Sequence, residues 1–449
     1  MDENYRLILE ALEYAGFETW LVGGCVRDAI LGREISDIDI ATSAQWQDTK
    51  RICEDAGFKI RETGTKHGTV TVINDDGGDY QAFEVTTFRA DSPTSSDARH
   101  PDSVQFVSSI KEDLARRDFT INAMAWHPER GLYDPYKGEQ DLKNKVIRAV
   151  GDPKKRFKED ALRILRACRF MSQLGFSLDH DTLAAMTSDK HFLTYVSKER
   201  VTHELDLLLM GDHVHDAIME TVDVLSVILP EFVAMKGCEQ ITKFHIYDVL
   251  EHTAWAVQQA AKDRMVRWAA LCHDMGKPAC AFFDDKGVEH FYGHAVVSAR
   301  IAEGLMRRFM LSKQFREDVC KLVSIHSDHG AVTKKSVRKY LFKLDGSIDL
   351  YKRMLDLNRA DILAHAPEYR YELQHIDELE EMLSAVLEEE SAFTANDLAI
   401  DGNDIIAMGV KPGPGVGRIL ESALEAVVEG RIENDKDSLM LFARSIAFH

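Results

Sequence analysis

The sequence predicts an α/β head followed by helical domains, and two contrasts along the chain support this. Residues 1–140 alternate short strand-like and helical segments, and 69–73 and 83–88 are rich in β-branched and aromatic residues, which favour strands. From about residue 150 onward, β-rich runs become few. A length of 449 residues suggests about two to four domains. We expect a head over 1–145, a helical neck over 146–235, a helical domain over 236–368 and a helical C-terminal part over 369–449.

The composition is that of an ordinary globular protein of a reducing compartment. Apolar residues make up 45% of the chain, and the seven cysteines form no CxxC pair, which indicates free thiols rather than a disulfide framework. The first residues lack the basic and apolar regions of a signal peptide. No apolar run approaches the roughly 20 residues of a membrane span. We therefore expect a cytoplasmic protein without a membrane partner.

The net charge of −20 is unevenly distributed along the chain. Seven lysines and arginines lie between residues 154 and 170, whereas 372–404 contains acidic residues and no lysine or arginine. Nucleic-acid affinity depends on where basic groups gather rather than on their sum. The start of the neck is therefore a candidate RNA-binding segment, and the acidic stretch is expected to be a solvated helical face.

A glycine pair followed by two acidic residues is the most informative local pattern. Gly23 and Gly24 allow backbone amides to approach a phosphate closely. Asp37 and Asp39 alternate with isoleucines, as in a half-buried strand, so both carboxylates are expected on one face. Such oxygen ligands suit Mg²⁺ together with substrate phosphates. The pattern predicts metal-dependent phosphoryl or nucleotidyl transfer, although either motif alone is common.

Four motifs in order resemble one enzyme family. They are LVGGCVRD at 21–28, SDID at 36–39, RRDFTINAMA at 116–125 and EDALR at 159–163. Together they resemble the bacterial-type (class II) tRNA nucleotidyltransferase and poly(A) polymerase family, strongly over the first half of the chain. The resemblance implies a polymerase-beta-like nucleotidyltransferase head followed by an all-α neck. It also implies Mg²⁺ as cofactor and tRNA, ATP and CTP as partners.

The resemblance assigns roles in the head. Asp37 and Asp39 would bind the catalytic Mg²⁺, while Gly23, Gly24 and Arg27 would position the triphosphate, with Arg27 offering a bidentate fork. Arg117 is the expected nucleotide contact.

Three further parts of the head carry predictions. Asn122 is expected to support the sugar or the local backbone. Glu84 is the best candidate for a third carboxylate, with an ordinary edge-strand residue as the alternative. Residues 89–101 resemble the flexible loop that the family needs for adding A after C. The loop keeps Arg89, Asp97, Arg99 and Pro101 but has His100 where many relatives have a second arginine.

A polar stripe marks the start of the neck. Asp160, Arg163, Arg166 and Arg169 recur every third residue, which on one helix gives a slowly drifting stripe. A salt-bridged surface helix is the structural alternative. By resemblance, Asp160 and Arg163 read the incoming base and select C and A over G and U. Arg166 and Arg169 would assist the base or the triphosphate.

A second candidate metal site lies in the middle of the chain. ALCHDMGK at 270–277 resembles the His-Asp motif of the HD phosphohydrolase superfamily. The resemblance implies a mixed nitrogen and oxygen site suited to a transition metal, with Lys277 assisting phosphate. The expected ligands are His252, His273, Asp274 and Asp361, with His294 and His326 as candidates for a second metal position. Phosphatase or cyclic-phosphodiesterase chemistry on RNA ends would follow as a side activity.

The leading hypothesis is a nucleotidyltransferase that adds C, C and A to the tRNA 3′ end from CTP and ATP without a nucleic-acid template. Four alternatives stay open at this point. They are an enzyme adding only A or only CC, a poly(A) polymerase, an HD-type phosphohydrolase with an RNA-binding head, and a non-catalytic RNA-binding protein. The last must explain two intact sets of metal ligands.

Overall fold

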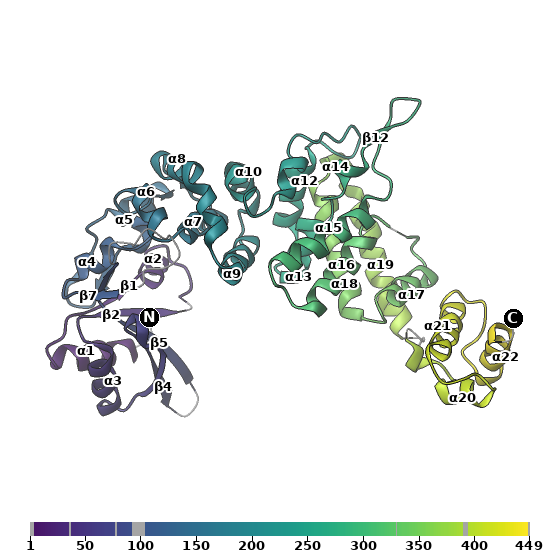
Figure 1. Cartoon of the computed structure of the whole chain (residues 1–449), viewed down its shortest axis with the longest axis horizontal. Helices are drawn as coiled ribbons and strands as arrows, with labels where there is room; N and C mark the ends of the chain where they lie inside the picture. The colour runs from purple at the N-terminus through teal and green to yellow at the C-terminus, as the bar shows by residue number, and fades with distance from the viewer. Residues whose placement is uncertain are drawn as a thin grey trace. The chain divides into compact units, whose positions relative to one another are not determined.

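The structure is a computed structural model that describes residues 4–35, 37–76, 79–91, 104–328, 330–388 and 394–447. The chain packs as two compact units, Met1–Ile228 and Leu229–His449, which follow one another along the colour gradient of Figure 1. The loop expected over 89–101 falls mainly outside the described residues, and Asp97, Arg99, His100 and Pro101 lie outside them.

A seven-stranded mixed sheet forms the centre of the head. Its strand order is β3-β4-β5-β2-β1-β8-β9. β2 and β5 pair in parallel, and the other neighbours in the sheet are antiparallel. The strands predicted at 69–73 and 83–88 are confirmed as β4 and β5. The bounds are β1 Thr19–Val22, β2 Ile38–Thr42, β3 Lys59–Gly64, β4 Thr69–Asp76, β5 Asp79–Thr87, β8 Ala125–His127 and β9 Gly131–Tyr133.

Amphipathic helices bury the apolar side chains of this sheet. α1 and α3 lie side by side beneath it in Figure 1 and pack against its strands, and α2 packs against β1 and β2. α1 is amphipathic, burying Tyr5, Ile8, Leu9 and Leu12 at the helical spacing. The remaining elements are short. The bounds are α1 Asn4–Tyr14, α2 Gly24–Ile30, α3 Trp46–Asp55, η1 Thr65–His67, β6 Arg89–Asp91, β7 Val104–Phe106, α4 Ile110–Ala115, η2 Thr120–Asn122 and α5 Gly138–Asn144.

The rest of the first unit is helical, as predicted from about residue 150. α7 packs against α9 and α10, and the two-residue strands β10 and β11 pair in parallel. The bounds are β10 Val146–Ile147, α6 Pro153–Glu159, α7 Leu162–Leu174, β11 Ser177–Leu178, α8 His180–Asp189, η3 Lys190–Tyr195, α9 Lys198–Leu209 and α10 Val214–Leu225.

The prediction of one helix carrying Asp160 together with Arg163 is wrong. The chain breaks between α6 and α7, and Asp160 has an extended backbone with φ −150°. Its Oδ1 accepts a hydrogen bond from the Leu162 amide at 3.1 Å. An aspartate side chain that bonds the backbone two residues on favours a helix start over a helix interior. Asp160 therefore lies at the entrance to α7 rather than on its face.

The second unit begins with a helical domain. Residues 237–244 lie in the coil between α11 and α12 within this unit, and α12, α13, α16 and α18 pack together. α19 packs against α17 and α18. The bounds are α11 Glu231–Met235, α12 Val249–Gln259, α13 Arg264–Cys272, α14 Lys277–Cys280, β12 Phe282–Phe283, β13 Glu289–His290, α15 His294–Arg308, α16 Lys313–Ile325, α17 Lys334–Lys343, α18 Ile348–Ala364, η4 Pro367–Glu372 and α19 Leu373–Leu387.

The last helices share a small core of their own, around Ile405, Ala423 and Leu439. Residues 409–413 lie between α20 and α21, and Pro414 is the first residue of α21. Proline fits there because the first helical N–H groups have no intrahelical partner. The bounds are η5 Ala395–Asp397, α20 Gly402–Ala407, α21 Pro414–Val428 and α22 Lys436–Ala447. Among the described residues, no helix combines the length and apolar character needed to cross a membrane.

Candidate active site

Three carboxylates approach one another at the centre of the head sheet. Asp39 lies in β2 and pairs in register with Glu84 of β5, while Asp37 is exposed and immediately precedes β2. β5 is bordered by β4 and β2, so the alternative that Glu84 is an edge-strand residue is wrong. Paired residues of neighbouring strands point to the same face. Asp39 and Glu84 therefore extend from the same side of the sheet.

The electrostatics of Asp39 show how closely this negative charge is gathered. Burial raises the pKa of the Asp39 carboxyl, the Arg117 guanidinium opposes that rise, and Glu84 and Asp37 add to it, giving a pKa of about 6. A divalent cation held by these oxygens would relieve their mutual repulsion. The donor set thus fits a hard cation of the kind predicted from the sequence.

Gly23 brings Arg117 close to this carboxylate group. Gly23 has φ +76° and precedes α2, and a Cβ at this position would come within 2.8 Å of Arg117 Nη1 and 3.5 Å of Asp39 Oδ2. Any other residue would therefore displace the guanidinium and strain the backbone. Arg117 Nη2 also donates to Asp113 Oδ2 at 3.3 Å. Glycine at position 23 therefore allows the Arg117 guanidinium to approach the backbone closely.

Arg27 has a different environment from the one expected. Its Nε and Nη2 donate to the two oxygens of Asp28 at 2.9 and 2.7 Å, and its Nη1 donates to Asn122 Oδ1 at 2.8 Å. Asn122 in turn donates to Asp118 Oδ1 at 3.2 Å. The bidentate fork of Arg27 is thus directed at Asp28, and a triphosphate contact of Arg27 stays a prediction. A triphosphate contact of Gly24, the first residue of α2, likewise stays a prediction.

Asp160 and Arg163, the pair predicted to read the base, are held by ionic partners. Asp160 Oδ2 accepts from Arg200 Nη2 at 2.7 Å. Arg163 is buried, with 9% of its surface exposed, and donates to Glu159 Oε2 at 2.9 Å and to the Arg116 carbonyl at 2.7 Å. These contacts restrict both side chains before any nucleotide binds. Preorganisation of this kind suits groups that must distinguish bases by hydrogen bonding.

Arg166 and Arg169 are bound into the protein more firmly than the sequence indicated. Arg166 pairs with Asp118 at 2.7 Å and Arg169 with Glu204 at 3.3 Å. The guanidinium carbons of both lie over the Phe170 ring, at 5.4 and 4.2 Å from its centroid. These contacts support a structural role for the two arginines. Direct help to the base or triphosphate stays a prediction.

A pocket of about 310 Å³ joins the carboxylates to the neck. The residues singled out from the sequence that line it are Asp39, Glu84, Arg89, Arg117, Asp160, Arg163 and Arg166. Gly23, Gly24, Arg27, Asp37 and Arg169, all of them described, are outside this lining.

Sequence reasoning gave no binding role to three other residues of this lining, Arg116, Asp118 and Arg200. Arg116 and Asp118 flank Arg117 in a recognised motif and could have been found there. Arg200 follows no motif, because only folding of α9 brings it to Asp160.

A second group of ligating side chains lies within the helical domain of the second unit. His252 Nε2 is 2.9 Å from Asp361 Oδ1 and 3.3 Å from His273 Nε2. Burial alone would lower the pKa of His273. The carboxylates of Asp274 and Asp361 outweigh this effect and raise the pKa of His273 to about 10. The four ligands predicted from the sequence thus come together from α12, from the residues that follow α13, and from α18.

The two additional histidines join the same centre. His294 Nε2 lies 3.2 Å from His326 Nε2, and the two are 3.4 and 3.7 Å from Asp274 Oδ1. The Nδ1 atoms of both rings face backbone carbonyls, of Phe291 at 2.9 Å and Val323 at 2.7 Å. A carbonyl accepts only, so Nδ1 carries the hydrogen and a neutral ring presents a lone pair at Nε2. Two lone pairs and a carboxylate then face one another, which is a donor set for a cation.

Sequence reasoning missed two further histidines of this cluster. His245, His252 and His365 have ligand atoms within 4.8 Å of one another. His365 lies one turn after Asp361, which is a helical spacing that could have identified it, whereas His245 lies in the coil before α12 with no motif. Lys277 is already paired with Asp274 at 2.7 Å and donates to Gln240 Oε1 at 2.6 Å. Its charge is therefore part of the cluster.

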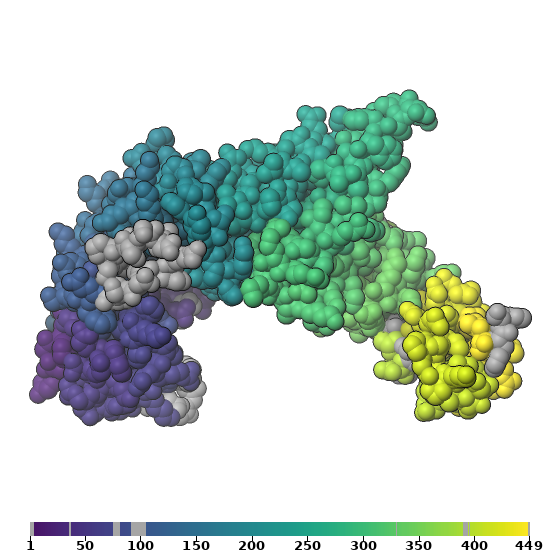
Figure 2. Space-filling model, in the orientation of Figure 1, coloured from purple at the N-terminus to yellow at the C-terminus, as the bar shows by residue number. Residues whose placement is uncertain are grey.

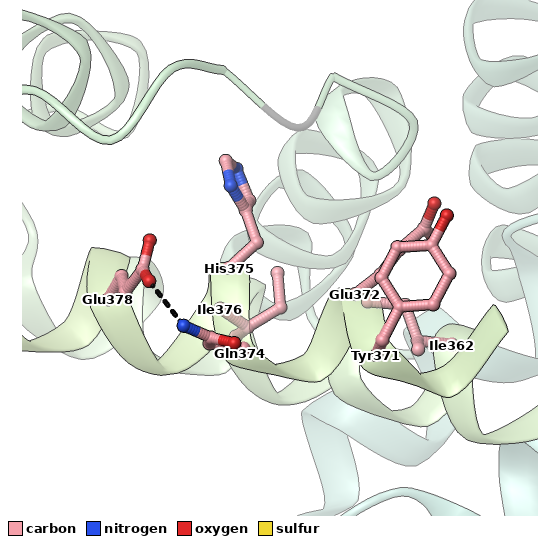
Figure 3. A pocket seen from close by; sticks show the side chains of 7 residues that line it. All are labelled: Ile362, Tyr371, Glu372, Gln374, His375, Ile376 and Glu378. Carbon is pink, nitrogen blue, oxygen red and sulfur yellow. Dashed lines mark hydrogen bonds between the residues drawn. The ribbon is translucent and has the colours of Figure 1, made fainter.

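The surface beside α19 has a hollow of about 430 Å³ that serves none of these sites (Figure 3). Gln374 donates to Glu378 at 2.9 Å along one side of this helix. No residue that the sequence singled out as a site residue lines it. The lining residues are Ile362, Tyr371, Glu372, Gln374, His375, Ile376 and Glu378.

Comparison with protein-family models gives three matches in chain order. The poly A polymerase head domain matches residues 19–148, and the probable RNA and SrmB-binding site of polymerase A matches 175–235. The putative domain 2 of tRNA nucleotidyltransferases matches 294–443.

Full-length relatives are similar along the whole chain. The CCA-adding enzyme of Limosilactobacillus fermentum is 34% identical over 446 residues, covering 98% of this chain and 95% of that protein. The CCA-adding enzyme of Levilactobacillus brevis is 34% identical over 438 residues, covering 98% and 96%. The structure of the Bacillus stearothermophilus CCA-adding enzyme in complex with CTP superimposes with a TM-score of 0.71 at 29% identity, covering 99% of this chain and 98% of that one.

Proposed function

The chain belongs to the CCA-adding enzymes, and we propose that its head and neck together carry the site that adds C, C and A to the tRNA 3′ end from CTP and ATP. It is a nucleotidyltransferase that works without a nucleic-acid template. The observation that supports our assignment most strongly is the pocket in which Asp39 and Glu84 of the head meet Asp160 and Arg163 of the neck. Reaction groups and base-reading groups then share one cavity.

The proposed cofactor is Mg²⁺, held by Asp37 and Asp39 with Glu84 nearby. When bound, Mg²⁺ stabilises both the attacking and the leaving oxygen of a phosphoryl transfer. The tRNA 3′ oxygen forms a bond to the α-phosphorus of CTP or ATP. The bond from that phosphorus to its bridging oxygen breaks, pyrophosphate leaves, and the hydroxyl proton passes to solvent. Arg116 and Arg117 supply positive charge beside the triphosphate, so catalysis rests mostly on positioning and charge neutralisation.

Base selection follows from the chemistry of Asp160 and Arg163. Both C and A present an amino donor next to a ring-nitrogen acceptor on their pairing edges, whereas U and G present a carbonyl acceptor next to a ring N–H. A carboxylate accepts only and a guanidinium donates only, so this pair is complementary to C and A. With U or G each contact would face a group of the same kind, which leaves buried polar groups unsatisfied.

Template-free incorporation into tRNA tests the assignment of this site. Purified protein with Mg²⁺ should incorporate CTP and ATP, and exclude UTP and GTP, with a tRNA that lacks its CCA end. Asp39→Asn should abolish incorporation while the protein stays folded. Incorporation that survives in Asp39→Asn would overturn the site. The relatives match over their full length as CCA-adding enzymes, which favours complete addition over an A-only, CC-only or poly(A) activity.

The four-part division at residues 145, 235 and 368 and a cytoplasmic location remain our proposals. All seven cysteines lie among the described residues as free thiols, which is typical of a reducing compartment. That is where tRNA is processed by a protein of this kind.

A second candidate function is metal-dependent hydrolysis of phosphate esters at the histidine cluster. It rests on the facing Nε2 atoms of His294 and His326 beside Asp274, which together could hold a metal cation. His252, His273, Asp274 and Asp361 would hold a transition metal, which when bound supplies an activated water. Lys277 would then help to balance the charge of a phosphate.

Metal analysis tests this second function directly. The purified chain should retain a transition metal after dialysis, and His273→Ala should lose it while tRNA incorporation is unchanged. His180→Ala is the matched control, because the His180 side chain is 95% exposed. Equal metal content in His273→Ala and wild type would contradict the assignment.

A further inference from the structure

The edge of the histidine cluster carries aromatic rings that neither proposed activity uses. Phe282, His290 and Tyr292, here called the aromatic platform, lie on and just after the hairpin of β12 and β13. The His290 and Tyr292 rings are stacked, with centroids 4.8 Å apart and planes 22° apart. Phe282 lies 5.5 Å from His290 and 5.7 Å from Tyr292. Tyr292 is 73% exposed and Phe282 45% exposed, so large apolar ring surfaces face solvent.

The platform is continuous with the cluster. Tyr292 and Phe291 line a cavity of about 380 Å³ together with Asp274, Lys277 and His294. The Phe291 carbonyl faces Nδ1 of His294 at 2.9 Å, so the segment that carries Tyr292 also orients a ligating histidine. The cavity therefore has ionic groups inside and an aromatic ring in its wall.

Hairpin stability explains only part of this arrangement. Phe282 and His290 are cross-strand partners in the two-stranded sheet, and such pairs stabilise a hairpin. Tyr292 lies beyond the strand and buries little of its side chain, so it adds little to the fold. Figure 1 shows the hairpin, labelled β12, extending from the helices of its unit, and Figure 2 shows the same segment as a green projection.

We propose that the aromatic platform stacks the base of a nucleoside phosphate, free or at the end of an RNA strand, whose phosphate occupies the cavity beside Asp274 and His294. The proposal rests on the hydrolase function proposed above and names its substrate class. Every base has a π face, so stacking on Tyr292 would accept any base. The metal proposed for the histidine cluster would bind the phosphate together with Lys277 while the ring holds the base, which divides recognition between the two ends of one nucleotide.

Tyr292→Ala tests the platform through kinetics. Adenosine monophosphate and glycerol 2-phosphate would be compared as substrates of the full chain loaded with its activating metal. We expect KM for the nucleotide to rise about tenfold, as loss of one base stack predicts, with kcat and all constants for glycerol 2-phosphate unchanged. Tyr292→Phe keeps an aromatic ring at this position and should have the wild-type KM. Equal KM changes for both substrates, or no change for either, would overturn the proposal.

Phe283→Ala is the matched control. Phe283 is a neighbouring aromatic residue that is 58% exposed, but side chains alternate along a strand, and it is neither in the platform nor in the cavity lining. Its loss should leave both substrates unaffected. An oligoribonucleotide with a 3′-phosphate would be assayed beside adenosine monophosphate. The substrate with the lower KM shows whether the site prefers an RNA end or a free nucleotide.

Photo-crosslinking gives a readout that needs no turnover. 8-Azidoadenosine monophosphate should label residues 282–292, mapped by mass spectrometry, and Tyr292→Ala should lose that label while keeping any label in the head. Label at 282–292 without hydrolysis would support the nucleotide-binding site and exclude the hydrolase activity. Hydrolysis with label only in the head would overturn the platform and leave the hydrolase standing.

Discussion

Asp39 and Glu84 occupy paired positions on the parallel strands β2 and β5, and the charge of Glu84 contributes to the raised pKa of Asp39. The two residues are 45 positions apart in the sequence. The crossover through α3, β3 and β4 is what places them side by side, since parallel neighbours need a long connection. Glu84, the best candidate for a third carboxylate from the sequence, is thereby a direct neighbour of Asp39.

Removal of these carboxylates should have graded effects on incorporation. Asp39→Asn should abolish detectable incorporation, a loss in kcat of at least about a thousandfold, because a metal contributes several kcal/mol to charge stabilisation in the transition state. Glu84→Gln should cost about ten- to a hundredfold, as for residues that support metal ligands. Steady-state incorporation of CTP measures both. Glu62→Gln on β3 is the control, since Glu62 pairs with Lys50 on the surface, and a loss in that variant equal to Glu84→Gln would refute the distinction.

The Mg²⁺ requirement should depend on pH through Asp39. Burial, together with Glu84 and Asp37, raises the pKa of Asp39 to about 6. Below that pH the carboxyl is protonated and cannot bind a cation, so the Mg²⁺ concentration for half-maximal rate should rise about tenfold per unit as pH falls below about 6. It should be constant above about pH 7. Glu84→Gln removes a negative neighbour and should move the inflection to lower pH; an unmoved inflection would exclude this coupling.

Asp160 should determine which nucleotides are accepted. Asp160→Ala is expected to lower kcat/KM for CTP and ATP by about ten- to a hundredfold, because a matched contact to a base discriminates by about 1–3 kcal/mol. Asp160→Asn, whose amide can also donate, should in addition raise UTP incorporation. Asp181→Ala, an exposed aspartate on α8, is the control. Thermal melts must accompany the assay, since Asp160 also pairs with Arg200, and unchanged selectivity in both variants would assign base reading elsewhere.

Gly23→Ala should weaken triphosphate binding through Arg117. The added Cβ would lie 2.8 Å from Arg117 Nη1, so the guanidinium must move, and loss of a charged hydrogen bond should raise KM for CTP roughly ten- to a hundredfold. Gly32→Ala is a matched control, because Gly32 also has positive φ but nothing within 4 Å of its Cβ position. Both variants share backbone strain of about 1–3 kcal/mol. An equal KM in the two would show that Arg117 is not involved.

Sequence reasoning predicted best where local pattern and chemistry coincide. The strands around Asp39 and Glu84 follow from alternation and β-propensity, and the pairing of β2 with β5 does not, because register over a long crossover is decided by tertiary packing. The helix break at Asp160 was missed, since a periodic spacing continues through it while the side chain accepts a hydrogen bond from the amide of Leu162, the first residue of α7. Arg200 and His245 were missed because each joins its site only through folding, whereas His365 could have been found one turn after Asp361.

Ionic partners were the hardest part of the site to predict. Arg27, Arg166 and Arg169 were expected to face ligand, yet their guanidiniums contact Asp28, Asp118 and Glu204. A buried arginine must be paired, and the sequence does not indicate whether the partner is a substrate or a carboxylate of the protein.

We propose that one site in the head and neck builds the complete CCA end. The decisive experiment incubates the purified protein and Mg²⁺ with labelled tRNAs that lack CCA, CA or A, with CTP, ATP or both. We predict full CCA on the shortest tRNA when both nucleotides are present, and no addition by Asp39→Asn. Arrest after CC, addition of A alone, or incorporation by Asp39→Asn would contradict the account.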